Sequence, residues 1–198
     1  MGLLILIIGL VVLLGAHVLV TMREQRAALM ARLGNAYRAV FALVSLAGLV
    51  LIIWGFKEYR AHELVQIWSP PAIMRDIMMP LVLLAVIILV SAFIPSHIRK
   101  WLKHPMLTSV KTWALAHLLA NGDLGGIILF ASVLLWAGYD RMTLKRRSDP
   151  GAPPIPVGGV TNDIVAVVVG TLIYLALGFV FHPLVIGLPA FGTPALGH

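Results

Sequence analysis

Long runs of apolar residues, separated by short clusters of charge, organise this chain from one end to the other. Residues 2–22 contain no charged side chain, and similar apolar runs occupy about 39–56, 77–96 and 164–182. A helix needs about 20 apolar residues to cross the hydrocarbon core of a bilayer. The four runs therefore predict four transmembrane helices. A cleavable signal peptide begins with positively charged residues, but no Lys or Arg precedes Arg23 in this chain. We therefore expect the first helix to be retained.

The middle of the chain is apolar too, but Asp123 interrupts it. One continuous helix would bury that carboxylate in hydrocarbon at considerable cost, whereas Asn121-Gly122 is a typical turn signal. We therefore predict two spans here, at about 106–121 and 123–140, with Asp123 at the far surface. In the last span, we expect Pro183 to end the helix, because proline cannot donate a backbone hydrogen bond.

The basic residues indicate how these helices are oriented. Twelve of the 15 Lys and Arg residues fall in the segments 22–38, 97–111 and 140–163, which six helices place on the same side of the membrane. Lys and Arg are enriched in cytoplasmic loops, so both termini are expected outside, in the periplasm of a bacterium. We therefore predict an all-α integral membrane bundle of six transmembrane helices in the bacterial inner membrane. Residues 1–198 would form a single domain, with a cytoplasmic loop at 141–163.

The composition narrows the possible functions. Apolar residues make up 60% of the 198 residues and charged residues only 12%, whereas a soluble protein has roughly 25% charged residues. The chain has no cysteine, which excludes disulfides, thiolate-ligated haem and Cys-held iron–sulfur clusters. Contact with anionic lipid headgroups explains the net charge of +7. Membrane lipid is therefore an expected partner, nucleic acid is not, and the oligomeric state is left open.

Two of the seven histidines lie well inside predicted spans, where an unsatisfied imidazole is costly, whereas His182 stands at the outer end of the span 164–182. His17 lies about one and a half turns inside the cytoplasmic end of its span, and His117 lies about three turns into its own. Each could simply bond to a neighbouring helix. Two neutral imidazoles on different helices are also what axial ligation of a b-type haem requires. We therefore predict His17 and His117 as ligands of a haem iron, with Trp113 and His104 as secondary candidates for contact with the haem.

Several motifs resemble the NnrU family of bacterial membrane proteins, and the resemblance covers most of residues 1–147. The motifs are Gly15-Ala16-His17, Leu33-Gly34-Asn35-Ala36-Tyr37-Arg38, Leu43-Val44-Ser45-Leu46-Ala47-Gly48, Trp68-Ser69-Pro70-Pro71, His104-Pro105-Met106-Leu107 and Trp113-Ala114-Leu115-Ala116-His117-Leu118-Leu119-Ala120-Asn121-Gly122-Asp123-Leu124. NnrU proteins are associated by name with nitrite and nitric oxide metabolism in denitrifying bacteria. The resemblance thus implies redox or sensing chemistry on a nitrogen-oxide or small apolar ligand.

The NnrU family is similar in turn to 15-cis-zeta-carotene isomerase, a membrane enzyme that binds haem b through histidines in corresponding helices. This similarity places the ligands on His17 and His117. The isomerase has a cysteine implicated in ligand switching just before the second histidine, where this chain has Ala114. A haem-dependent cis–trans isomerase acting on a carotenoid-like polyene is therefore our second hypothesis, and whether the chain is an enzyme is left open.

Two further functions are weighed against these. Lys103-His104-Pro105 resembles the Arg-His-Pro signature of membrane methyltransferases, but no Glu follows Glu63 and the Glu-Glu pair of that signature is missing. Methyl transfer is consequently less favoured than isomerisation. The third hypothesis is a structural or assembly factor without a cofactor, in which both intramembrane histidines only connect helices.

Overall fold

The fold is built from α-helices, which confirms the predicted all-α class. The computed structural model describes residues 1–146 and 157–191, and no β-strand occurs within these ranges. Residues 147–156, part of the predicted cytoplasmic loop, lie outside the described chain. The helices are α1 (Gly2–Thr21), α2 (Arg23–Leu33), α3 (Ala36–His62), α4 (Ala72–Ser91), α5 (His97–Leu102), α6 (Pro105–Ala120), α7 (Leu124–Lys145), α8 (Val160–Ala176) and the π-helix η1 (Leu177–Ile186).

Five helical segments in the described ranges are long and apolar enough to cross a membrane: α1, α3, α4, α7, and α8 together with η1. Large apolar side chains cover their outward faces. Val11, Leu43, Leu135 and Leu172, on four of these segments, are between 61% and 73% exposed. Extended apolar surface of this kind suits lipid rather than water. The chain is therefore a multi-pass membrane protein, as predicted.

The sixth predicted span corresponds to α6, which is not among these five segments. Its 16 residues rise by about 24 Å, which is less than the hydrocarbon thickness of about 30 Å. Length and composition alone therefore do not establish that α6 crosses the membrane. Six crossings and the outside location of both termini stay predictions.

The bounds of two helices, α4 and α3, differ from the predicted positions. Helix α4 begins at Ala72 and ends at Ser91, earlier than the predicted 77–96. Pro95 explains the earlier end, because it lacks the N–H that would bond to the Ser91 carbonyl four residues before it. Helix α3 continues past the predicted residue 56 to His62, and its Tyr59 is fully buried in this added turn.

The prediction that Pro183 ends the last helix was wrong. Pro183 lies inside η1, which continues directly from α8 and ends at Ile186, followed by the capping residue Gly187 with φ of 81°. In an α-helix the proline ring would clash with the carbonyl four residues earlier. The wider i→i+5 spacing of a π-helix relieves that conflict, and the proline is accommodated by a change of helix type.

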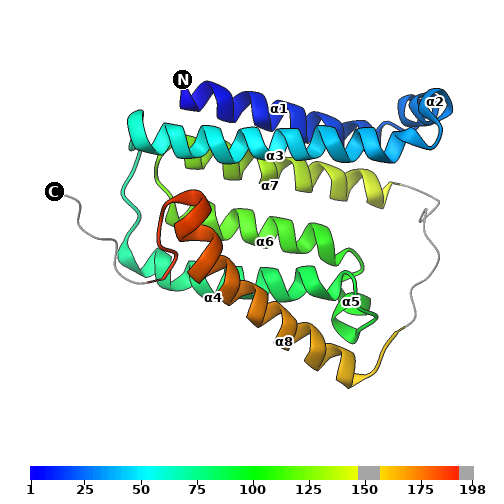
Figure 1. Ribbon diagram of the computed structural model, residues 1–198. Helices are drawn as coiled ribbons and strands as arrows, with labels where there is room; N and C mark the ends of the chain where they lie inside the picture. The colour runs from blue at the N-terminus through cyan, green and yellow to red at the C-terminus, as the bar shows by residue number, and fades with distance from the viewer. Residues whose placement is uncertain (147–156, 192–198) are drawn as a thin grey trace. The chain divides into compact units, whose positions relative to one another are not determined.

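The helices form two compact units, and each is described by itself. The first contains α1, α2, α3 and α7, and Figure 1 shows α1, α3 and α7 running alongside one another. Glycines bring α1 and α3 into backbone contact. A Cβ on Gly9 would lie 2.6 Å from the nitrogen of Ile52, and one on Gly48 would lie 2.8 Å from the nitrogen of Leu13. Small residues permit this close approach, which fixes the register of the two helices.

The second unit contains α4, α5, α6, α8 and η1, and in it α4 contacts both α6 and α8 (Figure 1). A buried hydrogen bond of 2.7 Å from Ser109 Oγ to the Ala85 carbonyl joins α6 to α4. Gly170 allows α8 to approach α4, because a Cβ there would lie 2.7 Å from the Cα of Ile87. Helix α6, which carries His117, is therefore held against α4 by a specific polar contact.

Candidate functional sites

His17 lies in α1, in the first unit, and its imidazole is held by its own helix. Its Nδ1 is 2.8 Å from the carbonyl oxygen of Leu13, one turn earlier. A carbonyl oxygen only accepts hydrogen bonds, so Nδ1 carries the proton and the lone pair of the neutral ring lies on Nε2. Metal-binding histidines are commonly oriented by a backbone bond of this kind from the other ring nitrogen.

Aromatic residues from two other helices surround the ring of His17. The centroid of the Phe41 ring, on α3, is 5.3 Å from that of His17, and the Trp136 ring, on α7, lies edge-on at the same distance. Tyr37 stacks on Phe41 with 6.3 Å between centroids. The neighbourhood of this predicted ligand is therefore aromatic, and flat rings of this kind pack well against a conjugated molecule.

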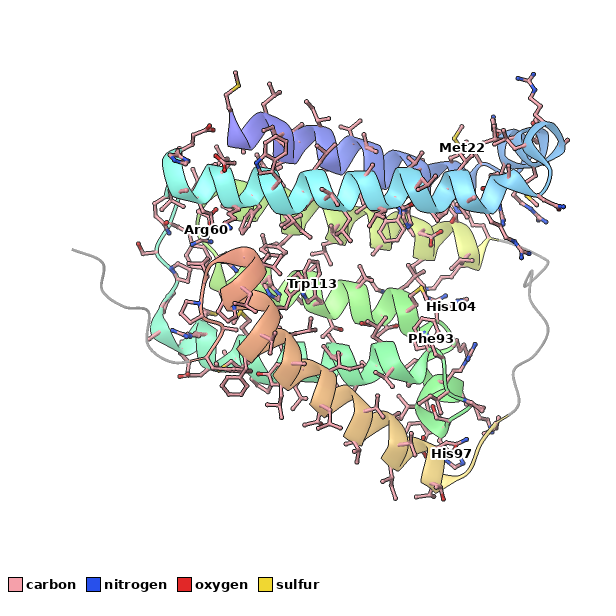
Figure 2. All side chains as sticks on the ribbon, in the orientation of Figure 1. Met22, Arg60, Phe93, His97, His104 and Trp113 are labelled. Atoms are coloured by element: carbon pink, nitrogen blue, oxygen red, sulfur yellow. The ribbon has the colours of Figure 1, made fainter. Side chains whose placement is uncertain are left out.

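His117 lies in α6, in the second unit, and its local geometry matches that of His17. Its Nδ1 is 3.0 Å from the Trp113 carbonyl, again one turn earlier, and the residue is 8% exposed. The Trp113 ring, labelled in Figure 2, lies 5.0 Å from the His117 ring. The structure therefore brings the secondary candidate Trp113 to His117, as their spacing on one helix requires.

A further imidazole, His182 of η1, lies beside His117. The two ring centroids are 6.4 Å apart, and the ring planes are inclined by 24°. Sequence analysis gave His182 no role, because it stood at the outer end of the last predicted span. The His182-Pro183 step was the available signal. A proline inside an apolar helix requires a local irregularity, and π-helical turns are frequent at functional sites.

His104 is not brought near His117. It directly precedes α6 (Figure 2), and its carbonyl accepts a hydrogen bond of 3.1 Å from the Thr108 nitrogen. The helix rises by about 20 Å between His104 and His117. The two imidazoles therefore lie near opposite ends of α6 and cannot bind the same iron.

Asp123, the residue that split the middle of the chain into two predicted spans, is buried at 2% exposure. Its Oδ1 accepts a 2.8 Å hydrogen bond from the Gly126 nitrogen and caps the start of α7. Its Oδ2 lies 3.1 Å from Arg60 Nη1, at the end of α3 (Figure 2). Next to Asp123, the Leu124 nitrogen donates a 2.8 Å hydrogen bond to the Val65 carbonyl, in the segment that follows α3. These contacts give Asp123 a structural role in joining α3 to α7.

A second pair, which sequence analysis did not predict, joins α5 to α8 in the other unit. His97 Nδ1 lies 2.6 Å from Asp163 Oδ2, and the Ile98 nitrogen donates to Asp163 Oδ1 at 3.3 Å (Figure 2). Beside this pair, Asn162 Nδ2 donates to the Pro95 carbonyl at 2.7 Å. No three His, Asp or Glu side chains gather into a metal-binding group within residues 1–146 and 157–191. The contacts of Asp163 with His97 and with the Ile98 nitrogen connect α8 to α5.

A comparison with protein families gives a match over almost the whole chain. The profile of the NnrU protein family matches residues 5–190, a range that includes both His17 and His117. Searches among curated proteins and among solved structures gave no match.

Proposed function

The chain belongs to the NnrU family, and we propose that it is a haem b protein of the bacterial inner membrane, with His17 and His117 as the axial ligands. The observation that carries this proposal is the shared geometry of the two imidazoles. Each Nδ1 donates to a carbonyl one turn earlier, at 2.8 Å for His17 and 3.0 Å for His117. Both rings are thereby oriented with the lone pair on Nε2, as an axial ligand requires.

The surroundings of each histidine also suit a haem. Phe41 and Trp136 flank the ring of His17, and Trp113 flanks the ring of His117. Such aromatic faces pack against a macrocycle and exclude water from its iron. A bound haem would supply a redox-active iron that can also take a small ligand. With the family's link to nitrite and nitric oxide, we propose a role in nitrogen-oxide redox chemistry or sensing during denitrification.

Purification in detergent from haem-replete cells tests the proposal. We expect a Soret band and a b-type pyridine haemochrome from the wild-type protein, and loss of both in His17→Ala and His117→Ala. His62→Ala is the matched control, because His62 is an exposed histidine of the first unit, with its side chain 69% exposed. Circular dichroism checks that each variant is folded. A folded but colourless wild-type protein would favour a structural or assembly factor instead.

Cis–trans isomerisation of a polyene is the alternative that the family resemblance raises. Ala114, which stands where the isomerase has a cysteine, is fully buried and offers no ligand atom to an iron. Ligand switching at that position is therefore not available to this chain. Expression in a host that accumulates zeta-carotene separates the two proposals, since an unchanged isomer ratio with haem-loaded protein argues against isomerase activity.

A further inference from the structure

Helix α2 does not follow the direction of the two helices that it joins. Figure 1 shows α1 and α3 running alongside each other, whereas α2 is seen along its own axis and crosses their ends. Met22 alone separates α1 from α2, and Gly34 and Asn35 separate α2 from α3. Gly34 has φ of 52°, a conformation that glycine adopts readily. These short links hold α2 across the ends of both helices.

The direction of α2 places it along the membrane surface. Helices α1 and α3 are long and apolar enough to cross the membrane, so a helix that crosses their ends runs in the plane of the bilayer. The 11 residues of α2 rise by about 16 Å. This length cannot cross a hydrocarbon core of about 30 Å.

The side chains of α2 are arranged as on helices that lie in a membrane interface. Leu29 and Leu33 are half-buried and share one face of the helix. Arg23 and Arg32 are exposed, and their spacing of nine residues puts them on opposite flanks of that face. An interfacial helix turns its apolar face toward the acyl chains and keeps its basic residues at the level of the headgroups.

The end of the first unit that carries α2 is strongly positive. We call residues 22–38 and 140–146 the basic end, because α7 runs antiparallel to α3 and finishes there (Figure 1). The basic end contains seven Lys or Arg side chains and two acidic ones. At the opposite end, residues 57–63 and Asp123 supply two basic and three acidic side chains. Positive charge is thus concentrated where α2 meets the membrane surface.

Two exposed arginines of the basic end have no partner among the described residues. Arg32 lies in the last turn of α2 and Arg38 in the first turn of α3, and neither forms an ion pair or a side-chain hydrogen bond there. In contrast, Arg60 at the opposite end pairs with Asp123 at 3.1 Å. A guanidinium group can donate two parallel hydrogen bonds to a phosphate. The chemistry of this surface therefore fits an anionic phosphate group.

We propose that α2 is an interfacial helix whose arginines, together with Arg38, bind the headgroups of anionic phospholipids in the leaflet at the basic end. The net charge of the chain indicates anionic lipid in general, and this proposal assigns it to one surface. It does not depend on the proposed haem function. Because α2 joins α1 to α3 through short links, lipid bound to it should stabilise the first unit.

Melting temperatures of the full-length protein in nanodiscs test the proposal. We expect wild-type protein to melt at least about 3 °C higher in phosphatidylglycerol than in phosphatidylcholine with the same acyl chains. Arg32→Gln/Arg38→Gln should lose about half of this difference, and in phosphatidylcholine it should melt like wild type, because no described residue pairs with either arginine. Lys57→Gln is the matched control at the opposite end of α3, where Lys57 is exposed. It should keep the full difference.

A single cysteine measures the position of α2 directly, since the chain has no cysteine of its own. Ala31 is exposed on the face opposite Leu29 and Leu33, so a fluorophore on Ala31→Cys points away from the half-buried leucines. We expect a nitroxide on the lipid headgroup to quench this fluorophore more strongly than one at the end of the acyl chain. Quenching by neither lipid would place α2 in water and overturn the proposal.

Three further outcomes would overturn the assignment to lipid. An equal effect of phosphatidylglycerol on wild type and on Arg32→Gln/Arg38→Gln would mean that the lipid acts elsewhere. No effect on wild type would mean that these arginines are only solvated. An equal rise with sodium phosphate in phosphatidylcholine nanodiscs would mean that the surface binds a free anion. None of these results bears on haem binding, which is read from the Soret band.

Discussion

At the residue scale, both oxygens of the buried Asp123 carboxylate have a partner. Asp123 is 2% exposed, and a buried carboxylate without a partner would be strongly destabilising. Arg60 supplies the opposite charge at 3.1 Å, and the Gly126 nitrogen uses the other oxygen. The same carboxylate therefore neutralises Arg60 and caps α7.

Arg60→Met should destabilise the protein by about 2 kcal/mol, because it leaves the Asp123 charge without its partner. The expected loss is below that of a fully buried pair, since the Arg60 side chain is 26% exposed and water can partly replace it. Thermal unfolding in detergent measures the change.

The exposed Lys57, on the same helix as Arg60, gives the control variant Lys57→Met, which should be close to neutral. The double variant Arg60→Met/Asp123→Asn should recover most of the stability, because neutral Asn still caps a helix. No recovery in the double variant would mean that Arg60 contributes by packing rather than by charge.

At the element scale, glycines decide how closely α1 and α3 pack. A Cβ on Gly55 would collide with the backbone of Leu6, which is itself fully buried. Gly9 and Gly48 continue the same line of contact along the two helices. Lipid tails are as apolar as the side chains, so this backbone approach supplies association that hydrophobic burial cannot.

Gly55→Ala should therefore destabilise the first unit by about 1–3 kcal/mol through overpacking. Gly15→Ala is the matched control on α1, because nothing lies within 4 Å of a Cβ at that position. Alanine favours helix over glycine, so the control should be neutral or stabilising by up to about 1 kcal/mol. Melting temperatures in one detergent measure both variants, and equal effects would show that the contact at Gly55 is adaptable.

At the scale of the whole molecule, contacts within the first unit bear on the number of membrane crossings. Residues 63–69 and the start of α7 must lie on one side of the membrane, because the Leu124 nitrogen donates to the Val65 carbonyl. Helix α4 is long and apolar enough to cross after residue 69. If it does, α6 has to bring the chain back before α7 begins, although it has only 16 residues. We therefore predict six crossings.

Single cysteines test this topology without a background signal, since the chain has no cysteine. In intact spheroplasts, a membrane-impermeant maleimide should label Leu64→Cys. Ala28→Cys, Lys100→Cys and Arg146→Cys should be labelled only after the membrane is permeabilised, because positive-inside orientation puts all three in the cytoplasm. Labelling of Arg146→Cys in intact spheroplasts would mean that α6 does not cross.

The sequence by itself determined the elements that depend on local pattern. The apolar run at 2–22 gave α1 almost to the residue, the Asn121-Gly122 step marked the break before α7, and the positions of His17 and His117 in apolar helices singled them out. Each of these features is visible in one short window, because span length and helix termination are set by neighbouring residues.

Only the tertiary structure decided which side chains meet. The approach of His182 to His117, the Arg60–Asp123 pair and the contact of Trp136 with His17 all join residues distant in the chain. Nearly every face of these helices is apolar, so the sequence pattern does not indicate which face turns toward a neighbour. Glycine contacts and buried hydrogen bonds fix that rotation, and they form only when the helices are packed.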